Sequence, residues 1–81
     1  MRPGGFFVFE LFHDIAQAES ARVRRLVVDR GLKDRVSFRN VGFDEALADL
    51  KARGGTTTPA LWDGEVLVMG EEAIAVRLRR A

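Results

Sequence analysis

The sequence predicts one α/β domain with the order strand, helix, strand, helix, strand, strand, helix. Three observations predict it: a dense apolar run at residues 4–12, helical spacing of apolar residues in two later segments, and an Asp63-Gly64 dipeptide between two short β-rich segments. Two parallel strands joined by a right-handed helical crossover, followed by a hairpin and a helix, form a four-stranded mixed sheet with helices on both faces. A chain of 81 residues forms a single core, so residues 1–81 are expected to be one domain.

The first strand and helix are predicted from the amino-terminal third. The stretch "GGFFVFELF", residues 4–12, has a single polar side chain, which is typical of a strand covered on both faces of a sheet. Asp14 can cap a helix over residues 15–30, and Gln17 three residues later completes a pair that resembles a capping box. Gly31 is the expected stop signal of this helix.

The middle of the chain predicts a second strand and a second helix. "RVSFRNV", residues 35–41, alternates apolar and polar side chains as a short strand does. A helix is expected to begin near Asp44 and to end at Gly54-Gly55. The chain therefore continues the strand and helix alternation without a linker.

The last third predicts a hairpin followed by a helix. Residues 60–62 and 65–69 are expected to be antiparallel strands joined by Asp63-Gly64, the dipeptide that suits a type I′ turn because both central residues need positive φ. A final helix is expected to begin at Glu71, where a carboxylate suits the helix dipole.

Composition excludes several classes of function. The chain has no cysteine, which excludes disulfides, thiol redox chemistry and thiolate metal sites, and its single histidine argues against a structural zinc site. The formal net charge of +1 gives no global field that would attract nucleic acid or a membrane surface. No apolar run approaches the roughly 18 residues of a membrane span. We expect a cytoplasmic protein with no metal, no nucleic acid and no membrane partner.

The segment "TTTPALWDGEVLVMGEEAIAVRL", residues 56–78, carries a family resemblance. It looks like the threonine-valine-proline segment, hairpin and final helix of glutaredoxins and of the amino-terminal domain of glutathione S-transferases. The resemblance covers residues 6–80, nearly the whole chain. It implies a thioredoxin-like fold of the glutaredoxin type, βαβαββα, with a cis Thr58-Pro59 bond.

The same resemblance identifies a redox position that has lost its chemistry. In glutaredoxins a Cys-x-x-Cys or Cys-x-x-Ser motif opens the first helix, and here "QAES" corresponds to it, with Gln17 at the first position and Ser20 at the second. A cysteine there would have a lowered pKa and be nucleophilic, whereas glutamine has no redox couple. Serine hydrolase chemistry from Ser20 and His13 is disfavoured because it needs the imidazole within hydrogen-bond reach and a third group to orient it. We expect no catalytic residue.

Ligand binding is the function that the resemblance leaves open. Glutaredoxins bind the two carboxylates of glutathione with basic residues and with the amino end of the last helix; the corresponding positions are Asp14, Thr56 and the turn at residues 70–72, two of which are acidic here. Like charges disfavour an anionic ligand. The backbone of Thr58 could still pair with an extended peptide. The expected binding residues are Gln17, Ser20, Thr58, Pro59, Gly70 and Glu71.

The sequence therefore predicts a redox-inactive glutaredoxin-like domain that acts as a binding or protein-interaction module. Its partner is an unknown protein or peptide, and the domain is expected to be a monomer or a homodimer. No cofactor is expected. The alternative is a glutathione-binding or glutathione S-transferase-like enzyme, although that family activates the glutathione thiol with Tyr, Ser or Cys and the chain has no tyrosine.

Overall fold

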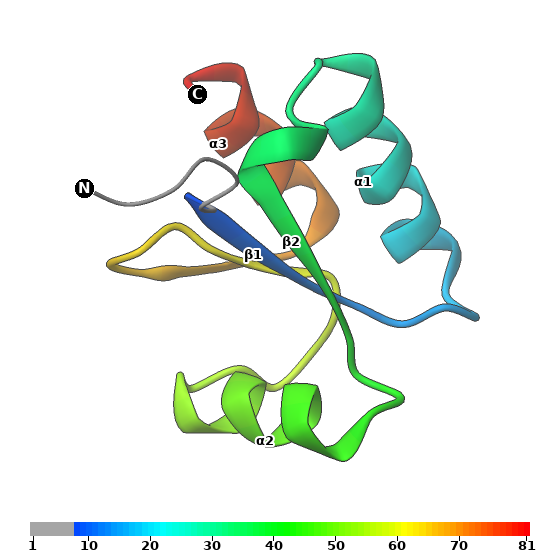
Figure 1. Ribbon diagram of the computed structural model, residues 1–81, viewed down its shortest axis with the longest axis vertical. Coiled ribbons are helices and arrows are strands. Elements are labelled where there is room, and N and C mark those ends of the chain that lie inside the picture. Colours follow the sequence, from blue (N-terminus) through cyan, green and yellow to red (C-terminus); the bar gives the residue numbers. More distant parts are fainter. Residues whose placement is uncertain (1–7) are drawn as a thin grey trace.

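The computed structural model describes residues 8–81, which form helices on both sides of a mixed β-sheet (Figure 1). The predicted α/β class and the predicted order of elements are confirmed. Residues 4–7 of the predicted first strand lie outside the described residues. The elements are β1 (Phe9–His13), α1 (Ala18–Asp29), the 3-10 turn η1 (Lys33–Arg35), β2 (Val36–Asn40), α2 (Asp44–Ala52), β3 (Ala60–Trp62), β4 (Leu67–Met69) and α3 (Glu71–Arg79).

The four strands lie in the order β2-β1-β3-β4. Strand β1 pairs in parallel with β2 and antiparallel with β3, so that Leu11 lies between Phe38 and Leu61. Strand β4 is antiparallel to β3. Figure 1 shows α1 and α3 on one face of the sheet and α2 on the other. The predicted four-stranded mixed sheet with helices on both faces is confirmed.

Two apolar clusters hold the layers together, because alternate side chains of β1 point to opposite faces of the sheet. Phe12 packs with Leu50 and Ala60 on the α2 face. Burial on both faces explains why the sequence of β1 is a nearly continuous apolar run. The cluster under α1 and α3 consists of Phe9, Leu11, Val23, Val27, Leu32, Val36, Leu61, Ile74 and Leu78.

The predicted start of the first helix was wrong. Helix α1 begins at Ala18 with Gln17 as its N-cap residue, three residues later than expected. The Asp14 carboxylate accepts a hydrogen bond from the Ala16 amide at 2.9 Å, and the Asp14 carbonyl accepts one from the Gln17 amide at 3.1 Å. Asp14 therefore forms a local turn instead of a helix cap. Gly31, with φ of 70°, ends the helix as predicted.

The predicted type I′ turn was also wrong, although the hairpin is antiparallel as expected. Gly64 has φ of 101°, but Asp63 does not have positive φ, and β4 begins only at Leu67. The Asp63 carboxylate accepts hydrogen bonds from the amides of Glu65 and Val66, each at 2.9 Å. These bonds lower the pKa of Asp63, and they stabilise a longer loop in place of a two-residue turn.

An ion-pair network on the α2 face positions α2 against the sheet. Glu10 of β1 accepts from Arg39 at 2.6 Å and lies 2.9 Å from Arg53 just beyond α2, while Arg39 also contacts Asp49 of α2 at 2.7 Å. The Arg53 guanidinium stacks 4.6 Å from the ring centre of Trp62. Each pair is partly exposed and contributes modestly to stability. Together they connect the carboxyl-terminal half of α2 to β1 and β2.

Gly55 offers a test of how closely α2 packs on the chain that follows it. A Cβ atom at Gly55 would lie 2.7 Å from Leu50 Cγ and 3.0 Å from the Leu50 carbonyl oxygen, so Gly55→Ala must push Leu50 or the loop aside. We expect a loss of roughly 1–3 kcal/mol in the free energy of unfolding, measured by urea denaturation. Gly42→Ala is the matched control, because its nearest neighbour is the Asn40 side-chain oxygen at 3.1 Å. Equal losses in the two variants would contradict this packing.

Candidate functional site

The structure brings three of the predicted site residues into one hydrogen-bonded network. Gln17, at the start of α1, donates from Nε2 to the carbonyl oxygen of Thr58 at 2.8 Å. The Thr58 hydroxyl donates to Gln17 Oε1 at 3.1 Å, and the Ser20 hydroxyl donates to the same oxygen at 2.5 Å. The Gln17 carboxamide is therefore used at both its donor and its acceptor ends. We call Gln17, Ser20 and Thr58 the carboxamide network.

Ser20 is a structural member of this network. Its side chain is fully buried, and its hydroxyl accepts the Asp14 amide at 3.1 Å while it donates to Gln17. The His13 ring instead contacts Arg24, with 3.0 Å between His13 Nδ1 and Arg24 Nη1. No hydrogen bond joins Ser20 to His13 in residues 8–81, so the described structure does not assemble a nucleophile and a base from these two side chains.

Pro59 and Gly70 join the network to the start of α3. The Thr58-Pro59 peptide bond is cis, as the resemblance implied. The Gly70 amide donates to the Pro59 carbonyl oxygen at 3.0 Å, and Gly70 has φ of 96°, which glycine adopts without steric cost. Gly70 is also the residue that caps α3. Four of the predicted residues are therefore linked in series. Gln17 is hydrogen-bonded to Thr58, Thr58 is followed by Pro59, and Pro59 is hydrogen-bonded to Gly70.

Glu71 is paired elsewhere. Both carboxylate oxygens of Glu71 accept from Arg22 of α1, at 2.7 and 2.8 Å. The hydrogen bond from Arg22 lowers the pKa of Glu71, and the pair joins α3 to α1 at the surface. The acidic charge that the sequence places at the start of the last helix is thus balanced by a cation from the same chain.

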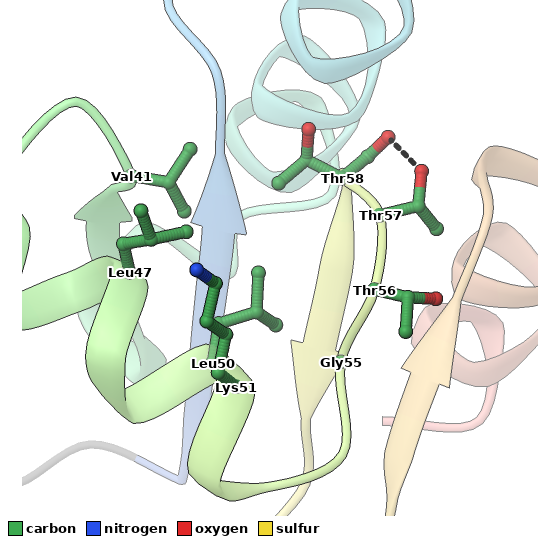
Figure 2. Close-up of a pocket in the computed structure, with 8 residues that line it drawn as sticks. All are labelled: Val41, Leu47, Leu50, Lys51, Gly55, Thr56, Thr57 and Thr58. Atoms are coloured by element: carbon green, nitrogen blue, oxygen red, sulfur yellow. Dashed lines mark hydrogen bonds between the residues drawn. The ribbon is translucent and has the colours of Figure 1, made fainter.

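A small pocket that the sequence analysis missed lies beside the carboxamide network. Figure 2 shows it between α2 and the loop that precedes β3, with side chains of α2 on one wall and three threonines on the other. Its volume is about 210 Å³, below the roughly 300–1,000 Å³ of sites for drug-sized ligands, so it can hold one side chain. We call it the threonine pocket, and its lining residues are Val41, Leu47, Leu50, Lys51, Gly55, Thr56, Thr57 and Thr58.

Residues 55–58, which we call the threonine loop, also offer backbone hydrogen-bond donors. Within residues 8–81 the amides of Thr56, Thr57 and Thr58 donate to no other group, whereas the Thr58 carbonyl is taken by Gln17. The sequence signal that could have indicated this wall is the run of three threonines before Pro59. The run has neither a helical nor a strand pattern, so it indicates a loop between α2 and β3. The loop therefore presents unpaired backbone donors next to an apolar pocket.

Comparison of the chain with models of protein families, with curated proteins and with solved structures finds no match. Among residues 8–81, no group of three or more histidine, aspartate or glutamate side chains is arranged to hold a metal ion. The helices of this part of the chain are all too short or too polar to cross a membrane. The resemblance to glutaredoxins rests on the residues quoted above.

His13 gives a prediction about pH. Burial and the neighbouring Arg24 lower the pKa of His13, with Asp14 opposing them, because the neutral ring accepts the Arg24 hydrogen bond and the protonated ring cannot. In the unfolded chain His13 has the ordinary pKa of about 6.5. The contribution of His13 to the free energy of unfolding is therefore complete above about pH 6.5, and it is lost as the pH drops from there through the lower pKa of the folded protein.

Since His13 is the only histidine, its ring signals in an NMR titration report this pKa without overlap. We expect a midpoint below 6.5 and a matching loss of unfolding free energy in acid that His13→Gln reduces. A midpoint at or above 6.5 would contradict the burial and the Arg24 contact.

Proposed function

We propose that this chain is a cysteine-free, thioredoxin-like domain of the glutaredoxin type that binds an extended peptide segment of a partner protein and catalyses no reaction. The strand order β2-β1-β3-β4 and the helices on both faces support the fold assignment. The meeting of Gln17, Ser20 and Thr58 at one end of the sheet supports the correspondence of these residues with the family's ligand site. A cytoplasmic location, the absence of a metal or cofactor, and the choice between monomer and homodimer stay predictions.

The observation that carries the proposal is the contact between Gln17 and the Thr58 carbonyl. By resemblance, the residue before the proline pairs through its backbone with a bound ligand, much as two strands pair. Here the Gln17 side-chain N–H donates to that carbonyl, as a ligand's backbone N–H would. The neighbouring amides of the threonine loop have no hydrogen-bond partner in the part of the chain that the structure describes. A site that recognises backbone and contains no thiol is suited to binding peptides by strand addition.

Glutathione binding is the second candidate, and one contact favours it. The sequence places acidic residues where the family has cationic ones, but Arg22 pairs with Glu71 at 2.7 Å. This pairing weakens the repulsion that a glutathione carboxylate would meet near the start of α3. Glutathione would still have to displace Gln17 from Thr58 to pair as it does in the family.

The proposal is tested by selecting peptides from a displayed library of random eight-residue sequences and titrating them into isotope-labelled protein. We expect saturable shifts of the Thr56, Thr57 and Thr58 amides and of the Gln17 side-chain NH₂ signals, because the peptide pairs with the loop. Reduced glutathione is titrated in parallel at millimolar concentration. Shifts with glutathione alone would favour the second candidate, and peptides that bind on another face would contradict the proposal.

Gln17→Ala separates the two roles of this side chain. The variant removes the closer of two internal donors to the Thr58 carbonyl and leaves the Thr57 hydroxyl at 3.4 Å. A selected peptide therefore meets less competition, and its Kd should fall by roughly 2- to 10-fold, the worth of one net hydrogen bond. The free energy of unfolding should also fall, because Ser20 loses its acceptor. Both are measured by titration calorimetry and urea denaturation.

Glu19→Ala is the matched control for Gln17→Ala, since Glu19 is exposed in the same turn of α1 and takes no part in the carboxamide network. It should leave the peptide Kd unchanged. Weaker peptide binding in Gln17→Ala than in Glu19→Ala would mean that Gln17 contacts the ligand directly instead of competing with it.

A further inference from the structure

The threonine pocket has one apolar wall and one wall formed by the threonine loop. Leu47 and Leu50 of α2 and Val41 after β2 supply the apolar side, and the loop of residues 55–58 faces them (Figure 2). Leu50 is buried in the core, whereas Val41 and Leu47 are half-buried and retain surface in the pocket. An aliphatic side chain entering this space would remove apolar surface from water on both partners.

The open amides of the threonine loop determine how such a side chain would arrive. An extended peptide that pairs with the loop directs alternate side chains to the same face, about 6.5–7 Å apart. One side chain can therefore enter the threonine pocket while the side chains two positions before and after it lie at the rim. The pocket volume of about 210 Å³ is large enough for one such side chain.

The charge at the rim comes from Lys51. It is the sole ionisable side chain among the lining residues, and Figure 2 shows its ammonium group pointing along α2 toward Leu47. In the described part of the chain, Lys51 has no carboxylate within ion-pair distance, which is also true of Lys33 and of several arginines, but it is the cation that lines this pocket. The nearby carboxylate of Asp49 is paired with Arg39. An unpaired cation at the mouth of an apolar pocket favours an acidic partner.

We propose that the threonine pocket binds an aliphatic side chain of an extended peptide, and that Lys51 pairs with an acidic residue two positions away from it. This inference rests on the proposed function and names the chemistry of the partner: a segment in which an aliphatic residue is flanked at the second position by aspartate or glutamate. Lys51 is a specificity-determining residue in this account, and Leu47 and Val41 select the aliphatic side chain.

The test uses the full chain and the capped peptide acetyl-Glu-Ser-Val-Ser-Glu-amide, which carries a carboxylate on both sides of the valine. Its Kd is measured by NMR titration beside two comparison peptides, one with glycine in place of valine and one with glutamine in place of both glutamates. We expect the glycine peptide to bind about tenfold more weakly or worse, because it leaves the pocket unfilled. The glutamine peptide should bind roughly two- to fivefold more weakly at low salt.

The variant Lys51→Gln completes the comparison. It should weaken binding of the glutamate peptide to the level of the glutamine peptide, and it should leave the glutamine peptide unaffected. Lys33→Gln is the matched control, because Lys33 is the only other lysine of the chain and lies outside the pocket. Lys33→Gln should leave both affinities unchanged.

The outcomes distinguish this inference from the proposed function. Equal binding of the glycine peptide, or a loss in Lys51→Gln that is the same for both charged and uncharged peptides, overturns the inference. If the threonine-loop amides still shift in that case, the peptide-binding function stands without the pocket. If none of the three peptides shifts these amides while other selected peptides do, the inference is again wrong. If no peptide shifts these amides at all, the inference and the proposed peptide-binding function both fail.

Discussion

The hydrogen bond from the Gln17 side chain to the Thr58 carbonyl connects two parts of the chain that are 41 residues apart. It joins the start of α1 to the loop that precedes β3, and it is one of several contacts that hold the threonine loop. The same carboxamide accepts from the hydroxyls of Ser20 and Thr58, so all three polar groups are satisfied together. A partly buried polar network of this kind favours one arrangement when it is complete, and it loses stability when a member is missing.

The opposite wall of the threonine pocket is held by different physics. Helix α2 lies on the sheet through the apolar contact of Leu50 with Phe12. The ion pairs Asp49–Arg39 and Arg53–Glu10 also connect it to the strands. The short connection through Gly55, whose amide donates to the Leu50 carbonyl at 2.9 Å, then directs the chain from α2 into the threonine loop. The pocket therefore lies between two anchors, which are α2 packed on the sheet and the contact of Gln17 with Thr58. Residues 53–57 connect the two anchors, so the pocket does not depend on a single element.

The order and the type of the elements could be predicted because apolar runs and glycines mark them clearly. The two errors, the start of α1 and the turn between β3 and β4, have one cause. Asp14 and Asp63 each bind backbone amides two or three residues further on, and such local bonds compete with the helix and turn patterns that residue types indicate. An aspartate that caps a helix and an aspartate that stabilises a local turn cannot be distinguished from the sequence alone.

The candidate site was predictable only in part. Gln17, Ser20 and Thr58 were identified from the family resemblance, but nothing in the sequence showed that the Gln17 side chain would donate to the Thr58 carbonyl. The sequence analysis did not single out Lys51, because a lysine in a helical segment does not show by itself that it will lie beside a pocket. The pocket needs the distance between α2 and the threonine loop, which depends on tertiary packing.

The hydrogen bond from Gln17 Nε2 to the Thr58 carbonyl is tested most directly by the scalar coupling across it, between Nε2 and the carbonyl carbon, in labelled protein without ligand. We predict a measurable coupling, together with one Gln17 side-chain proton that exchanges slowly with water. Absence of the coupling, with Gln17 side-chain protons that exchange as fast as those of a free glutamine, would contradict it, because the Thr58 carbonyl would then be open.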